Sequence, residues 1–416
     1  MNKPGSLLKP LDQALDELLG QAQVLEGLEE ISTFDGDGRV LAAEVVSSLQ
    51  VPPQDNSSMD GYALRSADVP VAGTILQVTQ RIPAGQHGQL LLPGEAARIF
   101  TGAPLPPGAD SIVMQEACEP LDQGARVRVN VVASTGQWVR RAGEDVTKGA
   151  VILAAGSRLS PAELGLAASI GLPTLKVARR PRVALFSTGD ELVMPGDIAP
   201  EHMPAGSIYN SNRFFLRALL QRLGCQVSDF GIVPDQRAAT QDALVRAAQQ
   251  HDLILTSGGV SVGEEDHIKP AVMALGALDL WQIDIKPGKP FAYGRITRPL
   301  PQGPCHFIGL PGNPVSSFVT FLLLVRPFLL TLQGMSQVRP ARTVMTANFD
   351  WPRADRRREF LRVRRNETGG LDLFPNQSSG VLTSAVWGDG LVDNPAGRTI
   401  VRGDQVEFIS FAELLA

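Results

Sequence analysis

The chain has 416 residues, of which 44% are hydrophobic and 19% are charged, as in globular proteins rather than disordered or fibrous ones. A formal net charge of -5 at pH 7 argues against nucleic-acid binding, which needs a basic surface. The three cysteines are widely separated, so they predict neither a disulfide framework nor a thiolate zinc site and favour a reducing compartment, the cytoplasm.

Leucines recur at helical spacing between residues 11 and 19 and predict an amphipathic helix. From residue 51 to 143, short apolar runs alternate with Pro and Gly clusters, which indicates a β-rich domain. A short strand at 151–153 and a helix at 161–170 follow. The basic segment 179–182 then marks a domain border.

From residue 182 to 334, strands and helices alternate, which predicts a parallel sheet flanked by helices. The predicted strands are 183–186, 226–233, 253–256, 278–285, 291–296 and 306–310. The predicted helices are 212–223, 236–250, 268–275 and 314–332. The longest apolar run, 318–325, is too short to cross a membrane and predicts a buried helix instead.

The remaining residues read as a small β domain, with strands expected at 360–364 and 399–402. The expected fold class is therefore multidomain α/β plus β, with a central α/β domain, a β-rich domain before it and a β domain after it.

Three loops follow predicted strands and contain the small residues that let backbone N–H groups approach an anion: 187–191, 257–263 and 309–317. In the third loop, Asn313 is expected to cap a helix that Pro314 begins. Because ligands of open α/β sheets bind at the carboxyl ends of strands, the three loops together predict a phosphate-bearing ligand. Any one of them alone would be an ordinary turn.

Two basic clusters stand out. Two of the seven lysines, Lys286 and Lys289, share one Pro- and Gly-rich turn, which suits an oxyanion, although a solvated loop is the alternative. Seven arginines crowd into residues 353–365. Within them, Arg362 and Arg364 share a face of the expected strand, so an oxyanion clamp and a solvated edge are both open.

Acidic residues accompany these loops, and carboxylates beside bound phosphate suggest Mg²⁺. Each of these acids, taken singly, is more often a cap, a turn residue or a surface charge. They are Asp60, Glu144, Asp145, Asp190, Glu191, Asp235, Glu264, Glu265 and Asp266.

Seven motifs in order along the chain resemble those of the molybdopterin molybdenumtransferase family, MoeA, whose relatives include the gephyrin and Cnx1 E-domains. They begin with Asp-Asn-Ser-Ser-Met-Asp-Gly-Tyr-Ala at 55–63 and include Lys-Pro-Gly-Lys-Pro at 286–290. The others are at 101–104, 141–145, 186–192, 257–263 and 310–316. The segment 388–390 departs from the family, which usually has Ala-Asn-Gly there.

The resemblance implies an elongated homodimer of four-domain subunits with a central molybdopterin-binding, MogA-like domain. The implied domains are 1–50 with 146–181 (elongated, helical and β, dimerising), 51–145 (inserted, β-rich), 182–334 (α/β) and 335–416 (C-terminal, β). It also implies Mg²⁺-dependent transfer of molybdate into adenylylated molybdopterin with release of AMP. Expected partners are a molybdopterin adenylyltransferase and molybdoenzyme apoproteins or their chaperones, with no nucleic acid and no membrane.

The resemblance also implies roles for individual residues. The expected catalytic residues are Asp60, Thr101, Asp145, Glu191, Asp235 and Asp266, of which Asp60, Glu191 and Asp266 would bind Mg²⁺. The expected molybdopterin and phosphate ligands are Ser187, Thr188, Gly189, Ser257, Gly258, Gly259, Ser261, Gly312, Asn313 and Ser316. The expected molybdate ligands are Lys286, Lys289, Pro290, Arg357 and Ser379.

Three alternatives stay open at this point. The chain could be a non-catalytic pterin-binding scaffold, an adenylyltransferase acting on molybdopterin itself, or a paralogue specialised for tungstate or one molybdoenzyme. Retention of Asp60, Asp266 and both lysines favours the transferase over the scaffold, and the long β-rich additions argue against the adenylyltransferase.

Overall fold

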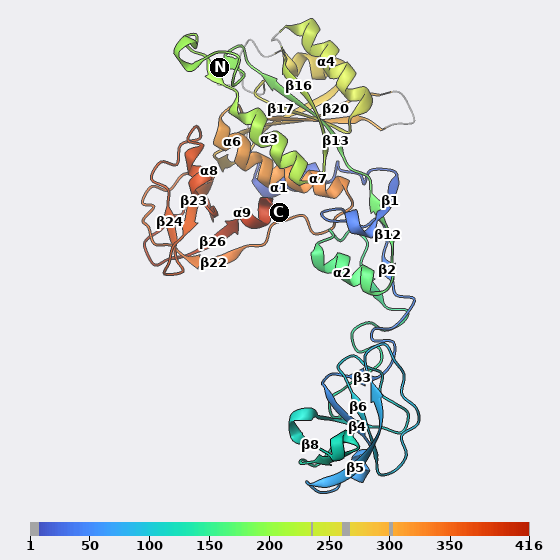
Figure 1. Cartoon of the computed structure of the whole chain (residues 1–416). Coiled ribbons are helices and arrows are strands. Elements are labelled where there is room, and N and C mark those ends of the chain that lie inside the picture. The colour runs from blue at the N-terminus through green and yellow to red at the C-terminus, as the bar shows by residue number, and fades with distance from the viewer. Residues whose placement is uncertain (1–7, 234–235, 260–266, 299–302, 416) are drawn as a thin grey trace. The chain divides into compact units, whose positions relative to one another are not determined.

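A computed structural model describes residues 8–233, 236–259, 267–298 and 303–415 (Figure 1). The chain divides into two compact units, and each is described by itself. Unit 1 comprises Met1–Glu29, Gly38–Ala42 and Lys176–Ala416, and unit 2 comprises Glu30–Asp37 and Ala43–Leu175. Two of the four borders between the units fall within strands β1 (Leu28–Ser32) and β12 (Thr174–Ala178).

A six-stranded sheet forms the centre of unit 1. Its spatial order is β16 (Gln226–Val233), β13 (Arg182–Thr188), β17 (Leu253–Ser257), β21 (Cys305–Leu310), β20 (Pro290–Ile296) and β18 (Gly276–Gln282). The first four strands are parallel, as predicted, but β20 and β18 are antiparallel to their neighbours. The reason is connection length, because only a few residues separate β18 from β20, too few for the helical crossover that parallel strands need.

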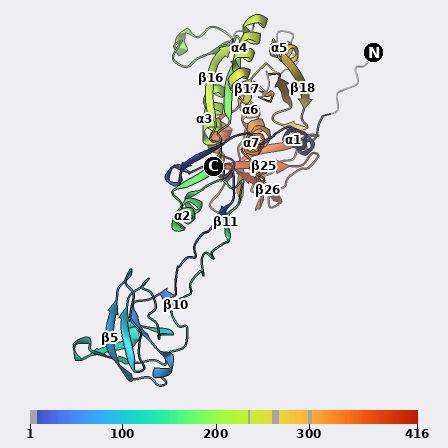
Figure 2. The ribbon, with the colours of Figure 1, turned by 90° about the vertical axis from the view of Figure 1, so that its right-hand side faces the viewer.

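Helices cover both faces of this sheet (Figures 1 and 2). The alternation of side chains along β13 shows which helices pack on which face. Val183 and Leu185 join one hydrophobic cluster, whereas Ala184 and Phe186 join the other. The first cluster contains side chains of α1 (Leu11–Leu19), α3 (Ser211–Arg222), α6 (Pro314–Thr320) and α7 (Arg326–Leu332). The second contains side chains of α4 (Arg237–Gln250) and α5 (Ile268–Leu275). The predicted helices of this region are thus confirmed, with ends shifted by a residue or two.

The helix predicted at 314–332 is continuous, because a π-helical turn, Phe321–Val325, joins α6 to α7. By length and composition alone the segment Pro314–Leu332 could cross a membrane, but 94% of its apolar window is buried inside the protein. It is therefore a core helix, as the sequence indicated.

A second sheet in unit 1 follows the long helix. Its strands, in spatial order, are β19 (Ile285–Lys286), β23 (Arg358–Arg365), β25 (Gly390–Asn394), β26 (Gln405–Ser410) and β22 (Thr343–Thr346), with β24 (Leu371–Leu373) beside β23. Helices α8 (Thr383–Trp387) and α9 (Phe411–Leu415) accompany it. The predicted strand 360–364 lies within β23, but the strand predicted at 399–402 is wrong. Only Ile400 pairs there, in one bridge to Trp351, because turns at Gly397 and Gly403, both with positive φ, leave no room for a strand.

Unit 2 is built mainly of β structure, as predicted. Its six-stranded sheet has the order β7 (Ser111–Met114), β4 (Gly61–Leu64), β6 (Glu95–Ile99), β5 (Thr74–Ile82), β9 (Arg126–Val129) and β8 (Cys118–Leu121). Two short pairs accompany it, β3 (Asn56–Ser57) with β10 (Val139–Arg140) and β2 (Val45–Val46) with β11 (Val151–Leu153). Helix α2 (Pro161–Ser169) begins with a capping box between Ser160 and Glu163, as a Ser-x-x-Glu sequence predicts.

Candidate functional site

A cavity of about 560 Å³ opens at the carboxyl ends of β13, β17 and β21 in unit 1. Register aligns the ends of these strands, since Ser187 pairs with Ser257 and Ser257 with Leu310. After β13 the chain forms β16 on one side of β13 and then β17 on the other side. The strand order therefore reverses at β13, and the cavity lies at this topological switch point. Open α/β sheets bind their ligands at this point.

Most residues expected at the phosphate site are brought together here. Those lining the cavity are Thr188, Gly189, Ser257, Gly258, Gly259, Gly312, Asn313 and Ser316. Glu191, expected to be catalytic, and Pro290, expected to bind molybdate, also line it. Ser187 is buried at the end of β13, outside the lining. Ser261, Asp235 and Asp266 lie outside the described residues.

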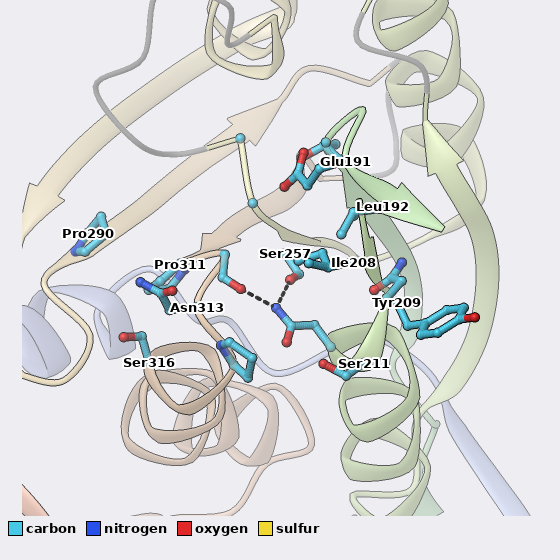
Figure 3. Close-up of a pocket in the computed structure, with 18 of the residues that line it drawn as sticks. Glu191, Leu192, Ile208, Tyr209, Ser211, Ser257, Pro290, Pro311, Asn313 and Ser316 are labelled. Atoms are coloured by element: carbon cyan, nitrogen blue, oxygen red, sulfur yellow. Dashed lines mark hydrogen bonds between the residues drawn. The ribbon is translucent and has the colours of Figure 1, made fainter. Parts of the chain in front are cut away.

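Asn212, at the start of α3, ties two of the loops together. Its Nδ2 donates to Ser257 Oγ and to the Gly312 carbonyl oxygen, both at 2.7 Å (dashed lines in Figure 3). The side chain of the neighbouring Asn210 accepts from Arg213 N and caps the same helix. The sequence suggested neither role, although Asn210 is a good N-cap type.

Several buried polar atoms at the cavity have no hydrogen-bond partner among the described residues. They include Thr188 Oγ1, Asn210 Nδ2 and Asn212 Oδ1. Buried polar groups in folded proteins are nearly always paired, so a cavity lined by unpaired donors and acceptors is suited to a polar ligand.

The second loop needs its glycines. Gly258 and Gly259 have φ of +91° and +68°, and a Cβ at Gly258 would lie 2.7 Å from the carbonyl oxygen of Thr188. The absence of side chains lets this backbone pass close to β13 and leaves its peptide groups at the edge of the cavity.

The amino end of α6 forms another wall. Pro314 occupies the first turn as predicted, but the expected side-chain cap is wrong, because the Asn313 side chain makes no capping hydrogen bond. Asn313 and Ser316 lie instead on the α6 side of the cavity, with Glu191 on the side of the β13 loop (Figure 3). A helix amino end with spare side-chain donors can bind an anion.

The lysine turn packs against the same helix. A Cβ on Gly288 would lie 2.4 Å from Thr320 Oγ1 of α6, so only glycine allows this approach. The Lys286 ammonium lies 3.1 Å from Asp355 Oδ2 and 3.1 Å from Glu359 Oε1. Burial would lower the pKa of Lys286, but the hydrogen bonds to these two carboxylates outweigh it and raise the pKa.

Arg357 contacts the same carboxylate as Lys286. Its Nε and one terminal nitrogen lie 3.2 and 3.3 Å from the Asp355 oxygens. Burial would raise the pKa of Asp355, but hydrogen bonds from Arg357 and Lys286 hold it far below its usual value. Asp355 is thus an anion held between two of the cations expected to bind molybdate, and sequence reasoning missed it.

Of the other three expected molybdate ligands, Pro290 lines the cavity, and Lys289 and Ser379 have different surroundings. The ammonium of Lys289 has no hydrogen-bond or ion-pair partner within the described part of the chain. The carbonyl oxygen of Ser379 accepts a hydrogen bond of 2.9 Å from Val315 N, which places this loop beside the first turn of α6.

Neither prediction for this strand, an oxyanion clamp or a solvated edge, describes both Arg362 and Arg364. Arg362 is 1% exposed and donates to Ser384 Oγ and to the carbonyl oxygens of Phe360 and Ser378. Arg364 is exposed and lies over the Trp387 ring, 4.5 Å from its centroid. Strand periodicity gives a common face but does not reveal that α8 covers only part of it.

The expected catalytic residues Asp60, Thr101 and Asp145 belong to unit 2. Asp60 Oδ1 accepts hydrogen bonds of 2.8 Å from both the backbone N–H and the hydroxyl of Thr101, and these lower the pKa of Asp60. Asp145 is exposed, and its N–H donates to the Val51 carbonyl oxygen. Asp55, in the same motif as Asp60, accepts instead from Arg141 and from Ala142 N, so it fixes the loop.

The described residues contain no group of three or more His, Cys, Asp or Glu side chains that could hold a metal. One carboxylate, Glu191, lines the cavity. A single carboxylate fits Mg²⁺ only if substrate phosphate oxygens and water complete the coordination, as Mg²⁺ commonly requires.

Comparison with known families covers almost the whole chain. Residues 9–171 match the MoeA N-terminal region (domain I and II), residues 184–331 match a probable molybdopterin binding domain, and residues 345–411 match the MoeA C-terminal region (domain IV).

Individual relatives agree with this. The chain is 40% identical over 367 residues to the molybdopterin molybdenumtransferase of Haemophilus influenzae, covering 87% of this chain and 88% of that protein. It is 36% identical over 387 residues to the protein of the same name from a Nostoc species, covering 90% and 86%. A crystal structure of the molybdopterin biosynthesis moeA protein from Pyrococcus horikoshii OT3 matches with a TM-score of 0.83 and 26% identity, over 97% of this chain and 100% of that one.

Proposed function

The chain belongs to the MoeA family of molybdopterin molybdenumtransferases, and we propose that its switch-point cavity is where adenylylated molybdopterin binds and receives molybdenum. The observation that carries this proposal is the set of unpaired buried polar atoms of Thr188, Asn210 and Asn212 around a cavity walled by glycine loops and the amino end of α6. The product would be molybdenum cofactor, with AMP released.

In this reaction water attacks the phosphorus of the pterin phosphate, the phosphoanhydride bond to AMP breaks, and AMP is the leaving group. Backbone N–H groups of Gly258 and Gly259 and the amino end of α6 bind the pterin phosphate. These dipoles are already oriented, so they stabilise developing negative charge without reorganisation. Molybdate is a substrate, held by Lys286, Lys289, Pro290, Arg357 and Ser379. The two dithiolene thiols of the pterin bind the metal, and one molybdate oxygen leaves as water with their protons.

Asp60 of unit 2 and Asp266 are proposed Mg²⁺ ligands. Glu191 would hold Mg²⁺ together with phosphate oxygens of the substrate. Bound there, Mg²⁺ would neutralise phosphate charge as the bond breaks. Asp60, Thr101, Asp145, Glu191, Asp235 and Asp266 are proposed as catalytic residues, and conservative variants such as Asp60→Asn and Glu191→Gln test them one at a time.

We further propose that the protein acts in the cytoplasm as a homodimer, taking its substrate from a molybdopterin adenylyltransferase and delivering cofactor to molybdoenzyme apoproteins or their chaperones. Light scattering of the purified protein tests the homodimer directly, and a monomer mass would contradict it.

The test of function is AMP release by purified protein from adenylylated molybdopterin, with and without Mg²⁺ and molybdate. The proposal expects AMP release that requires both Mg²⁺ and molybdate. Tight pterin binding without AMP release would favour the non-catalytic scaffold, and consumption of ATP with unadenylylated molybdopterin would favour an adenylyltransferase. Greater AMP release with tungstate than with molybdate would favour the tungstate paralogue.

A further inference from the structure

A second cavity, of about 430 Å³, lies at the opposite edge of the central sheet of unit 1. Arg182 is the first residue of β13, Asp252 directly precedes β17 and His306 lies at the start of β21, so the cavity faces the amino ends of the parallel strands. We call it the arginine pocket, because four arginines line it. Its charged lining residues are Arg179, Arg182, Arg295, Arg298, Asp252 and Glu26.

The four arginines and two carboxylates of this lining sum to a formal charge of +2. His306 adds none at neutral pH, since burial lowers its pKa to about 4. The whole chain has a net charge of -5, so its composition does not explain why four arginines line one cavity.

Two of the four guanidinium groups each donate at least three hydrogen bonds to the protein. Arg179 donates to both carboxylate oxygens of Asp252, at 2.8 and 2.9 Å, and to the Glu26 carbonyl oxygen. Arg298 donates to three backbone carbonyl oxygens, those of Gly303, Ala248 and His251. These two arginines shape the pocket and have little capacity left for a ligand.

The other two guanidinium groups are available. The buried Nε of Arg182 has no hydrogen-bond partner among the described residues, and the nearest carboxylate oxygen, of Asp252, is 3.8 Å away and already bound by Arg179. Arg295 is exposed in β20, and its guanidinium makes no hydrogen bond or ion pair with any described residue.

We propose that the arginine pocket binds the phosphate group of a small molecule through Arg182 and Arg295. The planar fork of a guanidinium matches phosphate oxygens bidentately, and two uncompensated charges match a phosphate dianion. The cavity is larger than one phosphate and falls in the size range of small-molecule sites, so a phosphate monoester fits as well as the free ion.

Calorimetric titration at constant ionic strength tests this, with inorganic phosphate in one arm and ribose 5-phosphate in the other. The test variants are Arg295→Ala, whose exposed side chain has no partner to lose on folding, and Arg182→Ala with Arg295→Ala. The matched control is Arg126→Ala with Arg128→Ala, which removes the same charge from an exposed and a half-buried position of unit 2.

The proposal expects the double variant in the pocket to weaken phosphate binding about tenfold or more. Arg295→Ala alone is expected to give a smaller loss, and the unit 2 control none. AMP release from adenylylated molybdopterin should be unchanged in all variants, which separates this pocket from the switch-point cavity. Stronger binding of ribose 5-phosphate than of phosphate would identify a monoester site, and the reverse a site for the free ion. Unchanged affinity in the double variant, or no saturable binding by the wild type, would overturn the proposal.

Discussion

The ammonium of Lys286 and the carboxylate of Asp355 lie 3.1 Å apart, and the same carboxylate also binds Arg357. Two cations proposed to bind molybdate are therefore neutralised in part by an internal anion. A molybdate dianion entering this site would have to displace Asp355 or tolerate its charge.

Replacing Asp355 by Asn should lower the KM for molybdate by roughly 3- to 10-fold, with little change in kcat. The ion pair is only partly buried, so the effect of one removed charge is discounted accordingly. The matched control is Asp350→Asn, an exposed carboxylate that accepts from Arg402 N and does not contact either cation. A higher KM in Asp355→Asn would mean that Asp355 positions the cations rather than competing for them.

Lys289→Ala should weaken molybdate use at least about tenfold and leave thermal stability nearly unchanged, because this ammonium forms no ion pair with the described residues. Molybdate KM and thermal unfolding, measured on the same preparation, check both parts. Parallel losses of stability and activity would contradict the assignment.

Asn212→Ala should reduce the free energy of unfolding by about 1 to 3 kcal/mol, since it removes two buried hydrogen bonds and leaves the Gly312 carbonyl oxygen unpaired. It should also raise the KM for adenylylated molybdopterin, because the loops after β17 and β21 lose their tie. Gln221→Ala, at an exposed position of the same helix, controls for the loss of a polar side chain on α3. An unchanged KM would show that the loops hold their positions without Asn212.

Gly258→Ala should reduce both stability and activity, because the new Cβ would lie 2.7 Å from the Thr188 carbonyl oxygen at a φ of +91°. The expected loss of stability is on the order of 1 to 3 kcal/mol. Gly165→Ala in α2 is the contrasting variant, since nothing lies within 4 Å of its Cβ position and helix propensity should add up to about 1 kcal/mol. Equal effects of the two substitutions in chemical denaturation would contradict this account.

The stability of the protein should fall as the pH drops from about 6.5 toward 4. Burial lowers the pKa of His306 from its ordinary value of 6.5 to about 4, so in this window the unfolded chain binds a proton that the folded chain does not. The stabilisation is complete above pH 6.5 and is lost as pH falls, by on the order of 3 kcal/mol over the full window. His306→Gln should flatten that slope in denaturation curves recorded across the window, and an unchanged slope would assign the dependence to other groups.

The position of the site could be predicted from the sequence because it depends on local patterns. Glycine- and serine-rich loops directly after apolar strands place Ser257 and Asn313 at the same edge of a parallel sheet, and the structure brings them to one cavity. Strands β20 and β18 were predicted, but their antiparallel pairing was not, because strand periodicity carries no direction.

The roles that could not be predicted from the sequence depend on contacts between segments far apart in the chain, or on burial that only the fold determines. Asn212 bonds to residues 45 and 100 positions away, and no spacing rule connects them. Asp355 lies within an arginine-rich run, and its role was not predicted because its partner Lys286 lies in a strand 69 residues earlier. Arg362 was judged by the face it shares with Arg364, whereas its burial is set by the loop at Ser378 and by Ser384 of α8.

The central claim is tested most directly by the stoichiometry of a single assay. Wild-type protein is incubated with adenylylated molybdopterin, Mg²⁺ and molybdate, and the AMP released and the molybdenum bound to pterin are counted together. The account predicts one AMP for each molybdenum inserted, with both products falling together in Asn212→Ala. AMP release that proceeds without molybdenum insertion, or molybdenum insertion without AMP release, would contradict it.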